Sequence, residues 1–296
     1  NIWSPFLPLL ERTPFHSQWG NERTLPSVFS KHGYKTAFLT TGPLTLYRKG
    51  EWMQDIGFGH VEGGEHPAYA NEKRFAFDSP SDSALYRRAL EWMQAERDPY
   101  FLVLETVTTH QPYTDPVSGE RSLEKAMRFA DQAFGEFLQR LNDVNFFGRG
   151  LLLGVSDHRS MTPVFAEEID QFGPAAISQV PAFFMGNEFV SQTVDDRVFS
   201  QADLLPTMEL WLSGSVEVSP QDGIMFGDFE TSKCAFHERG DRRGYMLATC
   251  PEGSGEVYLD GDNTRFVESA GLSEGREDSL LMTIARERIK GMLRHR

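Results

Sequence analysis

The amino-acid sequence predicts an α/β fold, a three-layer sandwich with a mostly parallel central sheet, followed by a small antiparallel sheet and a terminal helix. Three observations predict it: near-continuous apolar runs of strand length, helical patterns that alternate with them, and a change of texture after residue 214. We therefore expect a large α/β domain over residues 1–214 and a small C-terminal β subdomain with a terminal helix over residues 215–296.

The apolar runs are four predicted strands. They cover residues 35–42, 100–110, 150–158 and 180–186. Because helices cover both faces of a parallel sheet, its strands are apolar almost throughout instead of alternating. These runs therefore predict the buried centre of the domain.

Helical patterns lie between and after the apolar runs. They cover residues 24–33, 81–98, 122–147 and 201–212. Gly33 is a stop signal for the first pattern, and Ser81 and Asp82 open the second as capping residues. This alternation is typical of parallel strands joined by right-handed crossovers.

Beyond residue 214, short segments separated by Gly, Asp and Pro indicate antiparallel strands. They cover residues 223–230, 233–238, 244–250 and 256–262. A terminal helix over about residues 277–293 would carry its apolar side chains on one side. These are Leu280, Leu281, Ile284, Ile289 and Leu293.

The two cysteines, Cys234 and Cys250, flank one predicted hairpin. Its turn around residues 240–243 would set them nearly opposite each other, so a cross-strand disulfide is feasible. A disulfide would suit an oxidising compartment outside the cytoplasm. Two buried free thiols are the alternative.

The composition is that of a globular protein, with 40% hydrophobic and 24% charged residues among 296. The net charge of −14 argues against a general nucleic-acid binder, which needs clustered Lys and Arg. The sequence has no apolar run of the roughly 18 residues that a membrane helix needs, and its first residues lack the features of a signal peptide.

Chemically useful side chains follow three of the predicted strands. Thr40 and Thr41 end the first, His110 ends the second, and Asp157 and His158 end the third. Ligands bind at the carboxyl ends of strands in open α/β sheets, so we expect these ends to converge on one site. The Asp-His pair offers one oxygen and one nitrogen, which suits Zn or Mn better than Ca. Taken alone, the pair also fits a capping Asp beside a partly exposed His.

Four motifs carry a family resemblance. "TLPSVFSKHGYKTAFLTTG", "TVTTHQPY", "GVSDHRS" and "QADLLPTMELWL" occur in the order and approximate spacing of the alkaline phosphatase and sulfatase superfamily. The sequence most resembles the lipoteichoic acid synthase-like branch of phosphoglycerol transferases, over most of residues 20–215. The resemblance implies an alkaline phosphatase-like fold. It also implies that Asp157 and His158 bind a divalent metal, Mn²⁺ first with Zn²⁺ or Mg²⁺ as alternatives, and that His110 contacts the phosphoryl or leaving group.

The segment after the first strand resembles the family's headgroup-binding segment. Tyr47 matches its aromatic position and Lys49 its Arg position, which Arg48 could take after a shift of one residue. Lys cannot form the bidentate contact that Arg makes with phosphate. Tyr47 could also be an ordinary packing aromatic, and Glu105 is interpreted as a paired or edge carboxylate. Arg159 occupies a position where many relatives have Gly. Its side chain could hold an anionic headgroup or could simply be solvated.

Relatives carry a Thr nucleophile and an acidic metal ligand upstream of the first predicted helix. No predicted strand precedes this helix here, so we expect both, together with the first core strand, to be absent from this chain. Ser4 is the alternative nucleophile, but it fits that position poorly. Whether the chain alone turns over is left open.

The resemblance implies a metal-dependent phosphoglycerol transferase or hydrolase. Its substrate would be an anionic phospholipid or glycan headgroup, on the periplasmic or cell-surface side of a membrane reached through upstream segments. The first alternative is a sulfatase or phosphoethanolamine transferase of the same fold. The second is a non-catalytic domain that binds an anionic glycan or lipid headgroup.

Overall fold

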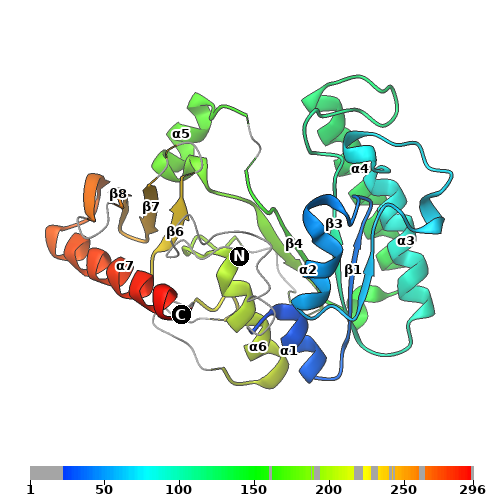
Figure 1. Ribbon diagram of the computed structural model, residues 1–296, viewed down its shortest axis with the longest axis horizontal. Coiled ribbons are helices and arrows are strands. Elements are labelled where there is room, and N and C mark those ends of the chain that lie inside the picture. The colour runs from blue at the N-terminus through cyan, green and yellow to red at the C-terminus, as the bar shows by residue number, and fades with distance from the viewer. Residues whose placement is uncertain are drawn as a thin grey trace. The chain divides into compact units, whose positions relative to one another are not determined.

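The computed structural model describes residues 23–159, 162–187, 189, 194–216, 223–227, 233–239, 242, 244–259 and 264–294, with side chains as far as 286. The chain divides into two compact units. The N-terminal unit contains the described residues up to 152 together with 184–187 and 189, and the C-terminal unit contains 153–183 and the described residues from 194 onward. Figure 1 shows the helices and strands of both units, coloured by residue number. This division falls inside the predicted α/β domain, and the boundary between residues 214 and 215 stays a prediction.

The N-terminal unit is built on a parallel sheet. Its strands β1 (Lys35–Thr40), β2 (His60–Glu62) and β3 (Tyr100–Glu105) lie in the order β2-β1-β3. Ala37 is aligned with His60 on one side and Leu102 on the other. The first two predicted strands are thereby confirmed, although each ends before the predicted limit, and β2 had no sequence prediction.

Helices cover both faces of this sheet, as Figure 1 shows for α2 and α3. On one face, Leu85 of α3 (Asp82–Ala95) packs against Ala37 and Leu39. On the other, Met53 of α2 (Lys49–Asp55) packs against Phe38. Because neighbouring strand residues point to opposite faces, the unbroken apolar run of β1 serves both layers. The predicted three-layer arrangement is therefore present in this unit.

Two further helices complete the N-terminal unit. In α1 (Leu25–Lys31), Phe29 stacks on Phe101 of β3 with ring centroids 4.2 Å apart. In α4 (Leu123–Asp143), Phe137 stacks on Tyr86 of α3 at 4.6 Å. Thr24 caps α1 by accepting a hydrogen bond from the Ser27 N–H, which satisfies one of the free donors at the helix start. These helices and α3 confirm the first three predicted helical patterns. The fourth pattern, residues 201–212, is also helical and belongs to the C-terminal unit.

The third and fourth predicted strands form a two-stranded sheet, β4 (Leu152–Val155) and β5 (Ala182–Met185). Helix α5 (Ala166–Phe172) and a 3₁₀ turn (Gly173–Ile177) lie between them in the sequence. A second 3₁₀ turn, Gln201–Asp203, leads directly into α6 (Leu204–Ser213).

The C-terminal unit contains the predicted antiparallel sheet and terminal helix. Strands β6 (Ala235–Glu238), β7 (Tyr245–Cys250), β8 (Gly253–Tyr258) and β9 (Arg265–Ala270) follow one another in order. Ile284 of α7 (Glu274–Arg294) packs against Met246 and Val257 of the sheet. The strand predicted over residues 223–230 is wrong for its described part, 223–227, which contains no strand. Strand β9 had no sequence prediction.

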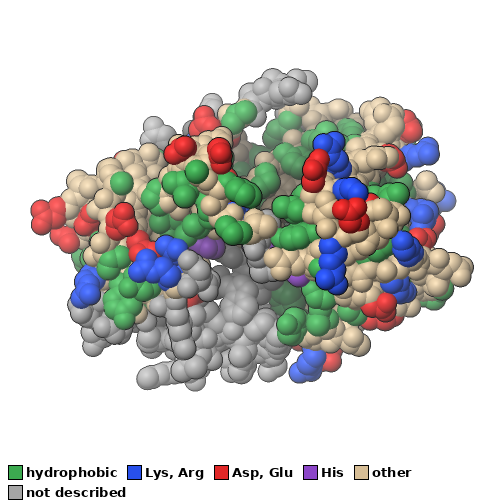
Figure 2. All heavy atoms as spheres, turned by 90° about the horizontal axis from the view of Figure 1, so that it is seen from above, with side chains coloured by type: hydrophobic (Ala, Val, Ile, Leu, Met, Phe, Trp, Pro, Cys, Tyr) green, Lys and Arg blue, Asp and Glu red, His purple; other side chains and the backbone are tan. Residues whose placement is uncertain are grey.

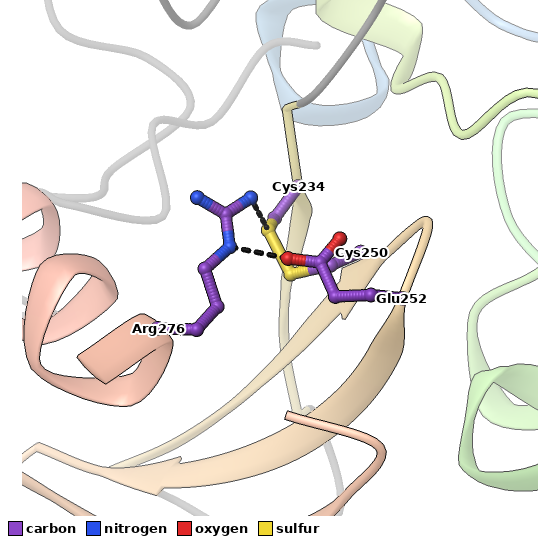
Figure 3. Close-up of a disulfide and its surroundings, with 4 residues drawn as sticks. All are labelled: Cys234, Cys250, Glu252 and Arg276. Atoms are coloured by element: carbon purple, nitrogen blue, oxygen red, sulfur yellow. Dashed lines mark hydrogen bonds and ion pairs between the residues drawn. A yellow bond between two sulfur atoms is a disulfide. The ribbon is translucent and has the colours of Figure 1, made fainter. Parts of the chain in front are cut away.

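Cys234 and Cys250 form a disulfide that joins the start of β6 to the end of β7. The alternative of two free thiols is therefore wrong. Figure 3 shows Arg276 of α7 beside the bond, donating to Cys234 Sγ at 3.4 Å and paired with Glu252 at 2.5 Å. The disulfide thus lies between the sheet and the terminal helix.

Two further observations concern membrane-spanning helices and surface charge. Within the described residues, no helix combines the length and apolar character needed to cross a bilayer. On the face shown in Figure 2, basic and acidic side chains are interspersed over the described parts.

Candidate metal and phosphoryl site

Asp157 and His158 lie in the turn directly after β4, with 85% and 54% of their side chains exposed. Asp157 Oδ2 and His158 Nε2 are 3.3 Å apart. Asp157 Oδ1 also accepts a hydrogen bond from the His158 backbone N–H at 2.8 Å. The two side chains therefore face each other at the end of a strand, as the sequence pattern predicts.

The tautomer of His158 is set by its neighbour. Its Nδ1 lies 2.7 Å from the Arg159 carbonyl oxygen, and because a carbonyl only accepts, Nδ1 must carry a hydrogen. In the neutral ring, Nε2 then presents a lone pair to the Asp157 carboxylate. Two acceptors at this distance repel each other unless a proton or a cation lies between them.

The pair has the chemistry and spacing of two metal ligands. Oxygen and imidazole ligands lie about 2.1 Å from Zn²⁺ or similar ions. Two such ligands 3.3 Å apart would subtend an angle at the ion between a right angle and a tetrahedral angle. A backbone carbonyl on Nδ1 is also one of the common outer partners of a metal-binding histidine. The residues present therefore fit a divalent cation.

Other side chains hold this turn. The Ser156 hydroxyl donates to the His158 carbonyl at 2.8 Å. The Gln201 side-chain amide donates to the carbonyls of Ser156 and Asp157 at 2.6 and 2.8 Å. Gln201 opens the motif "QADLLPTMELWL", for which the sequence predicted a helix but no contact with the turn.

Arg159 is not simply solvated, and the alternative that it holds an anionic headgroup stays a prediction. Its guanidinium forms a two-point ion pair with Glu168 of α5 and donates to the Thr162 carbonyl at 2.7 Å. Hydrogen bonds from Arg159 and from the Phe165 N–H hold the pKa of Glu168 below its usual value. In this structure Arg159 therefore ties the segment after His158 to α5.

His110 lies in the loop that follows β3. Its Nδ1 is 2.8 Å from the Gln111 carbonyl oxygen, so Nδ1 carries a hydrogen and Nε2 remains as an acceptor when the ring is neutral. The ring packs edge-on against Phe77, with centroids 4.5 Å apart. The peptide bond between Gln111 and Pro112 is cis.

A buried carboxylate organises the start of the His110 loop. Asp82, the first residue of α3, accepts hydrogen bonds from the N–H groups of Val107 and Thr108 at 2.8 and 3.0 Å. Its own N–H donates to the Thr108 hydroxyl at 3.0 Å. Burial raises the pKa of Asp82, and the two N–H donors oppose that rise. The sequence predicted Asp82 only as a helix cap.

The candidate headgroup residues follow β1. Tyr47 and Arg48 both have a left-handed backbone, with φ of 54° and 55°, in the turn that precedes α2. Tyr47 is 69% exposed, and Arg48 pairs with Glu51 on the surface. Lys49 Nζ instead donates to both carboxylate oxygens of Glu105, at 2.8 and 2.6 Å. Of the two cations, Lys49 is therefore the one bound at a strand end.

Thr40 and Thr41 serve the backbone at this edge of the sheet. Both are fully buried. Thr40 donates its hydroxyl hydrogen to the Glu105 carbonyl at 3.1 Å, and Thr41 donates to the Pro80 carbonyl at 2.9 Å. Their hydroxyls therefore connect the end of β1 to the end of β3 and to the segment that precedes α3.

The structure places the candidates in two groups. Lys49 and His110 belong to the N-terminal unit, and Asp157 and His158 belong to the C-terminal unit. Their predicted convergence on one site stays a prediction. In the part of the chain that the structure describes, no three His, Cys, Asp or Glu side chains gather in a cluster that could hold a metal ion. Ser4 lies outside the described residues.

Comparison with known proteins places these residues in a family. The sulfatase family model matches residues 5–214. Lipoteichoic acid synthase from Staphylococcus saprophyticus subsp. saprophyticus is 22% identical over 174 residues, which cover 51% of this chain and 26% of that protein. The match thus spans about a quarter of the relative's length.

Two solved structures share the fold. A protein of the alkaline phosphatase superfamily from Vibrio parahaemolyticus has a TM-score of 0.62 at 17% identity, covering 93% of this chain and 70% of its own. Lipoteichoic acid synthase LtaP from Listeria monocytogenes has a TM-score of 0.62 at 20% identity, covering 92% and 75%. The alkaline phosphatase-like fold implied by the sequence motifs is confirmed. Because the family match extends over more than half of its length, the chain belongs to the sulfatase family.

Proposed function

We propose that this chain is the main part of the catalytic domain of a metal-dependent enzyme that transfers or hydrolyses phosphoglycerol headgroups. Membership of the sulfatase family and similarity to a lipoteichoic acid synthase support the general kind of activity. The observation that carries the proposal is the Asp157–His158 pair, whose facing acceptor atoms lie 3.3 Å apart.

Asp157 Oδ2 and His158 Nε2 would hold the metal ion. When bound, a divalent ion supplies Lewis acidity and lowers the pKa of a coordinated hydroxyl. We propose Mn²⁺ as the ion, with Zn²⁺ and Mg²⁺ as alternatives. The protein's own contribution is to bind Nδ1 of His158 through the Arg159 carbonyl, which leaves Nε2 as the ring nitrogen that faces the ion.

His110 would act on the substrate's phosphoryl or leaving-group oxygen. With Nδ1–H bound to the Gln111 carbonyl, the proton that can move is the one on Nε2. In the charged ring, Nε2–H can donate to a phosphoryl oxygen and stabilise the charge that develops there. Packing against Phe77 would keep the ring in one orientation.

The headgroup would be received by Tyr47 and Lys49. The exposed Tyr47 ring offers a flat surface, and Lys49 offers a positive charge whose bond with Glu105 would have to be shared with the phosphate. We propose that the nucleophile is a Thr hydroxyl outside the described residues. Ser156, the hydroxyl next to Asp157, already donates to the His158 carbonyl.

The proposed substrates are anionic phospholipid or glycan headgroups outside the cytoplasm. The disulfide supports an oxidising compartment, since such bonds are rare in reducing ones. Anchoring in a membrane through upstream segments belongs to the same proposal.

The test is Mn²⁺-dependent release of the headgroup from fluorescent phosphatidylglycerol by the protein with its native upstream sequence. We expect Asp157→Asn to abolish release and Asp170→Asn, on the exposed side of α5, to leave it unchanged. Release from phosphatidylethanolamine or an aryl sulfate, and not from phosphatidylglycerol, would favour the corresponding alternative of the same fold. No turnover of any of the three would favour the non-catalytic binding domain.

A further inference from the structure

We infer that Gln201 is a positioning residue that keeps Asp157 and His158 in their cation-binding arrangement. The inference rests on the proposed function, because it assumes that these two side chains bind the ion. The hydrogen bonds from Gln201 to the turn go to backbone carbonyls and not to the side chains of Asp157 and His158. Its role would be to fix the backbone from which both project.

The turn needs such support because its side chains are open to solvent. Asp157 and His158 are more than half exposed, so packing does little to hold them. The Ser156 hydroxyl bond to the His158 carbonyl is local to the turn and cannot anchor it to the rest of the unit. Gln201, 44 residues beyond Asp157 in the sequence, provides an anchor from another element.

The geometry of this anchor is specific. The two hydrogens of one NH₂ group are shared between consecutive carbonyls, those of Ser156 and Asp157. Because both partners only accept, the amide nitrogen and not the amide oxygen must face the turn. Fixing two successive carbonyls fixes the peptide planes around Asp157, and hence the direction in which its side chain leaves the backbone.

Buried contacts of the neighbouring Asp203 hold the backbone at Gln201 in place. It begins the 3₁₀ turn Gln201–Asp203, whose last residue is buried. Asp203 accepts hydrogen bonds from the N–H groups of Ser200 and Gly223, at 2.7 and 2.9 Å, and forms a buried ion pair with Lys233. Breaking a buried pair of this kind is costly, so the backbone at residue 201 is held in place.

The expected effect follows from how outer contacts act on metal ligands. Residues that orient ligands without touching the ion typically change metal affinity by about 10-fold to 100-fold when they are replaced. Without the amide, the carbonyls of Ser156 and Asp157 can turn toward water and the facing arrangement is lost. The structure thus assigns part of the ion affinity to a residue outside the ligand pair.

The test measures Mn²⁺ binding directly, from the loss of the free-ion electron paramagnetic resonance signal, in the protein with its native upstream sequence. Gln201→Met keeps the side-chain length without donors, and Gln201→Ala removes the side chain. Both should raise the apparent Kd about 10-fold to 100-fold. Gln171→Met, at an exposed site on α5, is the matched control and should leave the Kd unchanged. Thermal unfolding without metal checks that each variant is folded.

The possible outcomes distinguish a failure of the proposed ligand pair from a failure of the positioning role of Gln201. If Asp157→Ala binds Mn²⁺ as well as the parent protein does, or the parent does not bind it, the proposed ligand pair is wrong. If Asp157→Ala loses binding while either Gln201 variant stays within about twofold of the parent, the ligand pair stands and the positioning role is overturned. Equal losses in both Gln201 variants, with unchanged unfolding temperatures, would establish that donation rather than packing is what the site requires.

Discussion

Removing the Cys234–Cys250 bond should lower the free energy of unfolding by about 3 kcal/mol. The bond joins residues 16 apart in the sequence. The chain-entropy relation for a loop of that size gives about 10 cal/mol/K, which is about 3 kcal/mol at 25 °C. The loss arises because the unfolded chain regains freedom, so it should appear even though β6 and β7 keep their backbone hydrogen bonds.

Urea unfolding followed by circular dichroism measures this change in three samples. They are the oxidised protein, the same protein in dithiothreitol, and the double variant Cys234→Ala/Cys250→Ala. Reduction should destabilise the parent protein and leave the double variant unaffected, which separates loss of the bond from loss of the sulfur atoms. A change of less than about 1 kcal/mol on reduction would refute the reasoning, because it would mean that the bond does not constrain the unfolded chain.

Three further predictions concern buried and paired charges. Asp82→Ala leaves two N–H groups of the His110 loop without their acceptor and should cost about 2–4 kcal/mol in chemical unfolding, whereas Asp82→Asn, which keeps an acceptor, should cost less. A double-mutant cycle of Lys49→Met and Glu105→Gln should give a coupling of about 1 kcal/mol, and a value near zero would contradict the two-point bond. Burial of Glu62 favours its neutral form, but hydrogen bonds, led by that from Arg88, outweigh it and lower its pKa below the usual 4.5. The stability contributed by the Glu62–Arg88 pair is therefore fully present above pH 4.5 and is lost as the pH falls through the folded-state pKa of Glu62. Chemical unfolding at several pH values should show that loss in the parent protein and not in Arg88→Met.

Much of the fold could be predicted because its strands are covered on both faces. In β1, Phe38 meets one helical layer while Ala37 and Leu39 meet the other, which produces an unbroken apolar run. The two strands without a prediction lack this signal. Strand β2 has only three residues, and β9 is exposed along most of its length. Neither carries enough buried apolar residues to stand out.

Only part of the candidate site could be predicted from the sequence. Asp157 and His158 are adjacent, so one motif sufficed to single them out. The contacts of Gln201 with the turn, of Asp82 with the His110 loop and of Arg159 with Glu168 connect residues 44, 25 and 9 positions apart. No periodicity or local motif encodes such pairings, because they depend on where the chain returns after folding.

The position of the disulfide has a consequence for how copies of this chain meet. Among the described strands of the antiparallel sheet, β6 lies at one edge with β7 as its neighbour. Edge strands present unpaired backbone groups, and a strand that leaves its sheet can pair with the same sheet of another molecule. Cys234 directly precedes β6 and is bonded to the last residue of β7. Strand β6 therefore cannot be exchanged between molecules by itself, and the covalent link protects the chain against domain swapping at this edge.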